Sequence, residues 1–202
     1  IVDENNFINF LNKYNLSSEK KIILYPGRLT EWKGQINFLK IMESYKGDQV
    51  ICYFAGDDKN KSYTSKLINE INKKNLQQNC KIIGHLSKED LKMMYKCADI
   101  VISAPLEPEG FGRTVSESLA MKKIVLCYDY GGVHDQLNGL DDIYKVSLHD
   151  QKEMKKKIDK IIKLSNPYKD NLGSISRRHV IKNFSKEKML EEYLNFYQNT
   201  VL

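Results

Sequence analysis

Two basic residues share a glycine-bounded segment that follows the strand-like run Lys21–Pro26. Arg28 and Lys33 lie between Gly27 and Gly34 and put two positive charges on one loop. Guanidinium and ammonium groups form charge-assisted hydrogen bonds with phosphate oxygens, so the pair suits a diphosphate. The segment has neither the glycine pattern of a dinucleotide-binding fold nor that of a P-loop, and it predicts neither kind of site. The alternative is a surface loop that is basic by chance.

A second group of candidates follows the strand-like run Asp99–Ala104. Here Glu109, Gly110, Phe111 and Gly112 lead directly into a helical stretch that contains Glu117. Glycines at a helix start let a ligand approach the free backbone N–H groups, and the helix dipole favours a phosphate there. Carboxylates beside such a site are useful as acceptors for sugar hydroxyls, because they repel the phosphates themselves. The alternative for Glu117 is an ordinary solvated helix residue.

The remaining acidic and sulfur-containing residues do not predict a metal site. The acidic pairs Asp57-Asp58 and Asp141-Asp142 have neither a DxD spacing nor a histidine nearby. The cysteines lie in apolar stretches without CxxC pairing, and we expect them to be reduced core residues of a cytosolic protein. They are Cys52, Cys80, Cys97 and Cys127.

The elements that must position the candidates alternate between short β-type runs and longer helical runs. This alternation predicts βαβ units and a Rossmann-like, doubly wound α/β fold with a parallel sheet of about six strands. Ligands bind such a sheet beyond the carboxyl ends of its strands, where both groups of candidates lie. The expected strands are Lys21–Pro26, Gln49–Ala55, Cys80–Gly84, Asp99–Ala104, Ile124–Tyr128 and Asp142–Val146. The expected helices are Gln35–Tyr45, Tyr63–Lys74, Lys88–Cys97 and Gly112–Met121.

The C-terminal quarter differs from the rest of the chain. Residues 150–202 show helical periodicity only, and they hold 12 Lys/Arg against 7 Asp/Glu, most of the net charge of +6. We expect a solvated basic face and no nucleic-acid partner; the alternative is peripheral contact with an anionic membrane. The last helix, from Ser185, has an apolar stripe that is either exposed, folded back or buried in self-association. The stripe is Met189, Leu190, Leu194, Tyr197 and Val201.

The length and the chain start also bear on organisation. The 202 residues suffice for one well-buried domain, and no window approaches the roughly 20 apolar residues of a membrane helix. The chain opens Ile1-Val2-Asp3 without a Met or a charged-then-apolar leader. We therefore expect no signal peptide and a start inside a longer protein.

Taken together, the motifs resemble the C-terminal, nucleotide-sugar-binding domain of GT-B glycosyltransferases, specifically the retaining family 4. The most specific match is Glu109 to Glu117, which is similar to the family's E-x7-E element and includes its Phe-Gly pair. The loop from Gly27 to Gly34 resembles its glycine-arginine and lysine-glycine signature. Further matches are Ile1-Val2-Asp3 with Phe7, Phe54-Ala55-Gly56-Asp57, and Ile83-Gly84-His85-Leu86-Ser87.

The resemblance implies a role for each candidate. It implies that Arg28 and Lys33 neutralise the donor diphosphate in place of a metal, so that no cofactor is expected. It implies that Glu109 faces the donor sugar, which makes these three the expected catalytic residues, and that Glu117 accepts hydrogen bonds from the ribose. The other implied donor-binding residues are Gly27, Gly56, Asp57, His85, Leu86, Phe111, Gly112, Arg113, Thr114 and Val115.

The resemblance also implies a division of labour between domains. Residues 1–20 are expected to be an interdomain segment and residues 21–202 the donor-binding domain, with a glycan or lipid-linked acceptor bound by an N-terminal domain. Cell-surface polysaccharide or lipopolysaccharide synthesis is the expected context, and the 202 residues alone are expected to transfer nothing. The alternatives are a nucleotide-sugar epimerase or phosphorylase of the same architecture, and a non-catalytic nucleotide-binding domain.

Overall fold

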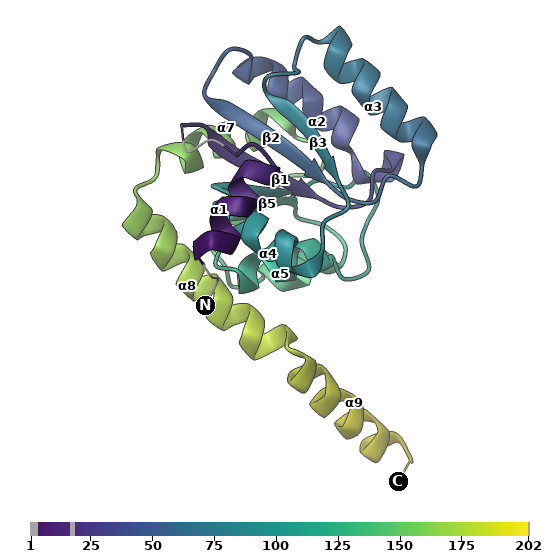
Figure 1. Ribbon diagram of the computed structural model, residues 1–202. Coiled ribbons are helices and arrows are strands. Elements are labelled where there is room, and N and C mark those ends of the chain that lie inside the picture. Colours follow the sequence, from purple (N-terminus) through teal and green to yellow (C-terminus); the bar gives the residue numbers. More distant parts are fainter. Residues whose placement is uncertain (1–3, 17–18, 202) are drawn as a thin grey trace.

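A parallel sheet forms the centre of the computed structural model, which describes residues 4–16 and 19–201 (Figure 1). The strand order is β3-β2-β1-β4-β5-β6, and each neighbouring pair is parallel. Strands β2, β4 and β5 are buried along their whole length, as expected where helices cover both faces. The Rossmann-like α/β fold predicted from the sequence is confirmed. The strands are β1 Lys21–Pro26, β2 Val50–Ala55, β3 Cys80–Gly84, β4 Ile100–Ser103, β5 Val125–Tyr128 and β6 Lys145–Val146.

Helices cover the sheet in two layers. Helix α2 packs against α3 and α7 on one face, while α1 packs against α4 and α5 against α8 on the other (Figure 1). The α-helices are α1 Glu4–Lys13, α2 Gln35–Met42, α3 Lys61–Lys73, α4 Lys88–Cys97, α5 Arg113–Ala120, α6 Gly132–Leu137, α7 Gln151–Lys163, α8 Asn166–Phe184 and α9 Lys186–Val201. Short 3-10 turns lie at Glu31–Lys33, Glu43–Tyr45 and Asp142–Tyr144.

The predicted strand Asp142–Val146 is wrong over its first half. The Asp141 carboxylate accepts a hydrogen bond of 2.8 Å from the Ile143 N–H, and this cap starts the 3-10 turn Asp142–Tyr144 in place of a strand. Only Lys145–Val146 pairs with β5.

Several other boundaries also differ from the sequence-based expectation. The predicted helix Gln35–Tyr45 ends as an α-helix at Met42 and continues as a 3-10 turn. Helix α3 begins at Lys61, two residues before the prediction, because the Asn60 side chain caps it by accepting from the Tyr63 N–H. Gly112 precedes α5 as its N-cap. The other strand and helix ends coincide with the prediction or shift by one residue, and Lys21–Pro26, Cys80–Gly84 and Lys88–Cys97 match at both ends.

Two helices of the structure have no counterpart among the predicted elements. Helix α1 occupies much of the predicted interdomain segment and buries Phe10 in the core, while Ile1-Val2-Asp3 lies outside the described residues. Helix α6 begins after Gly131, whose φ of +64° lies in the region that favours glycine.

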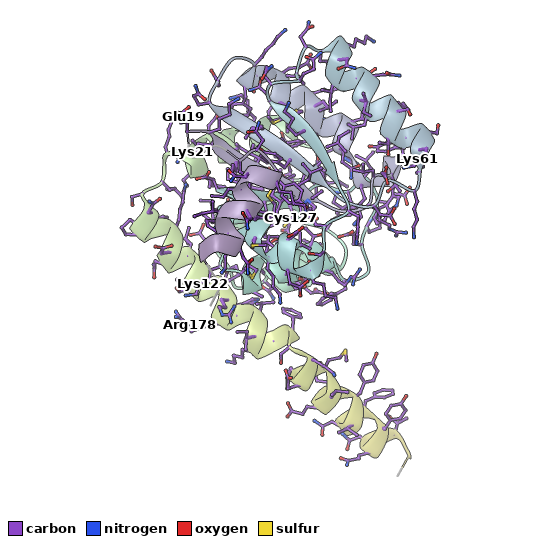
Figure 2. The ribbon with its side chains drawn as sticks, viewed as in Figure 1. Glu19, Lys21, Lys61, Lys122, Cys127 and Arg178 are labelled. Carbon is purple, nitrogen blue, oxygen red and sulfur yellow. The ribbon has the colours of Figure 1, made fainter. Side chains whose placement is uncertain are left out.

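The helical C-terminal end is confirmed, and its last helix stands apart from the sheet. Helix α9 extends beyond the body of the domain, with its side chains clear of the other elements (Figures 1 and 2). The structure does not describe the Val201 side chain. The other residues of the predicted apolar stripe are 47–62% exposed: Met189, Leu190, Leu194 and Tyr197. In the part of the chain that is described, no helix is both long and apolar enough to cross a bilayer.

Candidate functional site

A cleft of about 910 Å³ opens at the carboxyl edge of the sheet, between the loops that follow β1 and β4. The strand order reverses between these two strands, which is where open α/β sheets place their ligands. The structure brings nearly all sequence-predicted site residues to this cleft. Those that line it are Gly27, Arg28, Lys33, Gly56, Asp57, His85, Leu86, Glu109, Phe111, Gly112, Arg113, Thr114 and Glu117.

Close backbone contact sets the shape of the cleft at β1, β2 and β3. The Gly27 N–H donates to the Ala55 carbonyl and the Gly56 N–H to the Gly84 carbonyl, each over 2.8 Å. A Cβ at Gly56 would lie 1.8 Å from the Gly27 carbonyl oxygen, so only glycine fits there. These two hydrogen bonds join the loops that follow β1, β2 and β3 side by side along the carboxyl edge of the sheet.

Lys33 and Glu109 form an ion pair across the cleft. The Lys33 ammonium contacts Oε1 of Glu109, and the two side chains are only 14% and 9% exposed. The pair is fixed in place because the Trp32 carbonyl accepts a hydrogen bond of 2.6 Å from the Leu106 N–H, which joins the β1 loop to the β4 loop. Oε2 of Glu109 is buried and has no hydrogen-bond partner among the described residues. One glutamate oxygen is therefore left without a donor at the wall of the cleft.

Arg28 differs from Lys33 in that its charge is uncompensated. Its side chain is exposed at the cleft, and no ion pair engages the guanidinium within residues 4–16 and 19–201. Its backbone carbonyl accepts a hydrogen bond of 2.9 Å from the buried Gln35 amide, which fixes the loop and leaves the side chain free. Of the two cations predicted to bind the diphosphate, Lys33 is therefore paired, whereas Arg28 has no ion pair among the described residues.

The glycine-rich loop before α5 is held by a buried glutamine. Gln136 on α6 is fully buried, and its amide donates to the carbonyls of Phe111 and Gly112. Gly112 has a φ of +79°, and a Cβ there would lie 2.6 Å from Cγ2 of Val133. The loop therefore requires glycine at this position and is supported from behind by α6.

The start of α5 presents backbone donors to the cleft. Arg113 and Thr114 are its first two residues and line the cleft, and helix geometry leaves their N–H groups without an intrahelical partner. Val115 is placed differently from the other predicted residues. Its side chain is buried in the core, and its N–H donates to the Gly112 carbonyl over 2.9 Å.

Glu117 lies one turn further along α5 and has a partner. The buried Tyr95 hydroxyl donates to Oε2 of Glu117 over 3.2 Å. Burial raises the pKa of Tyr95, and the adjacent carboxylate raises it further, so the phenol stays protonated. Glu117 is therefore more than a solvated helix residue.

Sequence reasoning missed several residues at the cleft. Lys88 and Leu91 lie on α4, two and five residues after Leu86. Their closeness in sequence to the predicted residues His85 and Leu86 could have indicated them. Gln136 does not line the cleft but supports its glycine-rich loop from behind, and no sequence signal indicated this role. The other lining residues without a predicted role are Pro26, Trp32, Ala55, Pro108 and Gly110.

The acidic and cysteine residues are dispersed through the structure. Within residues 4–16 and 19–201, no three His, Cys, Asp or Glu side chains gather as metal ligands would. The Asp57 carboxylate accepts from the Lys59 N–H over 2.8 Å, and Asp141 caps a 3-10 turn. The four cysteines are unpaired thiols, all but Cys97 buried.

Comparison with known proteins places the chain among glycosyltransferases. The family described as glycosyl transferases group 1 matches residues 6–196. An uncharacterized glycosyltransferase of Methanocaldococcus jannaschii is 30% identical over 142 residues, which are 66% of this chain and 34% of the relative.

Two solved structures show the same fold. A glycosyltransferase from Rickettsia africae superposes with a TM-score of 0.89 at 30% identity, over 98% of this chain and 52% of the other. The structure of Anabaena HepE in complex with UDP and glucose gives a TM-score of 0.83 at 18% identity, over 98% and 53%. The chain thus spans about a third to a half of the length of these proteins.

Proposed function

This chain belongs to the glycosyl transferases group 1 family, and we propose that its cleft binds a nucleotide-diphosphate sugar as the donor-binding domain of a retaining glycosyltransferase. The observation that carries the proposal is the meeting of Arg28, Lys33 and the start of α5 at the switch point between β1 and β4. Two cations and free helix N–H groups in one cleft form a site for a diphosphate.

The diphosphate is the leaving group of the proposed reaction, and its charge must be stabilised as the sugar departs. Arg28, the Lys33 ammonium and the N–H groups of Arg113 and Thr114 supply that stabilisation from fixed positions. These groups are part of the folded chain, so the proposed chemistry requires neither a metal nor a cofactor.

The two carboxylates suit the hydroxyl groups of the donor. Oε2 of Glu109 is a buried acceptor to which no described residue donates, and a hydroxyl of the donor sugar would satisfy it. Glu117 lies on α5, one turn after the start of the helix, and suits the ribose hydroxyls. In this proposal Glu109 acts at the sugar and Glu117 at the nucleoside. The UDP in the HepE complex supports a uridine nucleotide as the first donor to test.

The proposal assigns the acceptor to another part of the enzyme. Residues 21–202 form the donor-binding domain, residues 1–20 lead into it, and an N-terminal domain binds a glycan or lipid-linked acceptor for cell-surface polymer synthesis. The shorter span of this chain relative to its relatives supports such a second domain. In this arrangement the 202 residues bind donor without transferring sugar.

Calorimetric titration with UDP and UDP-glucose in the presence of EDTA tests the donor site. We expect binding without metal, and we expect Arg28→Ala with Lys33→Ala to weaken it severely, since each charge-assisted contact is worth about 1.5–3 kcal/mol. The matched control is Lys40→Ala with Lys46→Ala, which removes the same charge from exposed side chains that do not line the cleft. Unchanged affinity in the Arg28 and Lys33 variant, or an absolute need for magnesium, would refute the proposal.

A further inference from the structure

Tyr95 joins the helix after β3 to the helix that carries Glu117. Its side chain is 2% exposed, and its hydroxyl donates to Oε2 of Glu117 over 3.2 Å. Leu91, one turn earlier on α4, lines the cleft together with Glu117, whereas Tyr95 does not line it. The hydroxyl therefore reaches Glu117 from the protein interior and not from the ligand side.

The direction of this hydrogen bond leaves one glutamate oxygen available. Burial raises the pKa of Tyr95 and keeps its phenol protonated, so the Tyr95 O–H donates this bond to Oε2 of Glu117. Oε2 of Glu117 is occupied by that bond, while Oε1 is engaged by no other described residue. Glu117 is thus held at one oxygen and can accept from a ligand with the other.

A free glutamate at this position would be mobile. Glu117 is exposed, and a long exposed side chain samples several rotamers in water, so a ligand must order it at a cost in affinity. The hydrogen bond from the Tyr95 hydroxyl orders the Glu117 side chain in the free protein, so the ligand does not have to order it on binding.

We infer that Tyr95 is a positioning residue that holds Glu117 to accept a ribose hydroxyl, and that it thereby makes the cleft selective for ribonucleoside over dideoxyribonucleoside diphosphates. This inference rests on the proposed function, because it assumes that a nucleoside diphosphate occupies the cleft. Tyr95 would thus help to determine which class of nucleotide binds, although the ligand does not contact it.

Tyr95→Phe removes only the hydroxyl and tests the inference. Calorimetry with UDP and with 2′,3′-dideoxyuridine 5′-diphosphate gives selectivity as the ratio of the two Kd values. We expect the wild-type chain to prefer UDP, and Tyr95→Phe to reduce that preference by about 3- to 10-fold, the penalty for ordering one long side chain. The affinity for the dideoxy nucleotide should stay constant, because it has no ribose hydroxyl to offer Glu117.

Tyr144→Phe is the matched control. Tyr144 is 1% exposed, and its hydroxyl donates to the Leu172 carbonyl over 3.2 Å, a contact outside the cleft. This variant should keep the wild-type ratio. In a Glu117→Ala background, Tyr95→Phe should no longer change the ratio, because the group that Tyr95 positions is absent.

The outcomes separate this inference from the proposed function. A wild-type chain that binds no nucleoside diphosphate refutes both. Wild-type binding of UDP together with full selectivity in Tyr95→Phe overturns the positioning role and leaves the proposed function intact. Equal weakening of both nucleotides, or failure of Tyr95→Phe to fold, also overturns it, because the hydroxyl would then have a structural role only.

Discussion

Glu109→Gln is expected to tighten the binding of UDP, although Glu109 lies in the proposed catalytic site. In the structure the Glu109 carboxylate compensates the charge of Lys33, one of the two cations offered to the diphosphate. The substitution keeps the size of the side chain and a hydrogen-bonding oxygen but removes the negative charge. Lys33 would then present its full charge to the phosphates.

The magnitude follows from the placement of the pair. A phosphate that contacts Lys33 from the cleft is separated from Glu109 by two ion-pair contacts, or about 8 Å, and a unit charge at that distance is worth about 2 kcal/mol at an effective dielectric constant of about 20. Physiological salt, with a Debye length of about 8 Å, reduces this to about 0.7 kcal/mol where the site is open to solvent. Side-chain exposures of 14% and 9% place the pair between these limits. UDP affinity should therefore rise by about 3- to 30-fold.

Calorimetric titration with UDP at two salt concentrations measures the effect. The gain should shrink as salt rises, and it should be smaller with UDP-glucose, whose sugar loses its contact to Glu109. Glu107→Gln is the matched control, because Glu107 lies on the same loop, is exposed and does not line the cleft. Unchanged or weaker UDP binding in Glu109→Gln would show that the carboxylate does not oppose the diphosphate, and the assignment of Lys33 to the phosphates would be wrong.

The remaining predictions concern the frame around the cleft. Gly112→Ala should lower Tm and UDP affinity, because the new Cβ would lie 2.6 Å from Cγ2 of Val133 at a left-handed backbone position that costs about 1–2 kcal/mol; an unchanged melting curve would contradict this. Gln136→Leu should cost about 1–3 kcal/mol in urea unfolding, since it leaves the part-buried Phe111 carbonyl without its donor; a wild-type midpoint would contradict it. The hydrogen bond from Lys13 holds the pKa of Asp90 below its ordinary value of 3.8, so its contribution to stability is present above that pH and is lost as pH falls through the lower folded pKa. Asp90→Asn should therefore make the free energy of unfolding less dependent on pH below about pH 4. A pH dependence as steep as that of the wild-type chain would contradict a stabilising contact between Lys13 and Asp90. Truncation after α8 should leave Tm unchanged and reduce binding of an apolar dye, because the α9 stripe is exposed; a collapse in Tm would show that α9 supports the core.

Much of the fold could be predicted from the sequence because strands of a parallel sheet are buried on both faces. Such strands appear as short continuous apolar runs, and five of the six predicted strands match the structure to within one residue at each end. The exception at Asp142 arose from a side-chain cap, which a strand-like pattern of residue types does not reveal. Helix α6 was not predicted because it is short and begins at adjacent glycines, which indicate a turn as readily as a helix start.

The sequence by itself determined that the main charged candidates reach the cleft. Loops at the carboxyl ends of parallel strands meet at one edge of the sheet, so chain order and strand pattern were enough to bring Arg28, Lys33, Glu109 and Glu117 to one place. The local glycines followed in the same way, since tight turns and close backbone approach restrict the residue type.

Only the tertiary structure decided how these residues pair. Lys33 and Glu109 are 76 residues apart, and Tyr95 and Glu117 are 22 apart, so no local spacing connects either pair. The sequence pattern predicted two cations for the diphosphate, whereas the structure shows one of them compensated by a carboxylate. Ionic pairing and burial depend on distances of a few ångströms between separate elements, and those distances are fixed by the packing of helices and loops on the sheet.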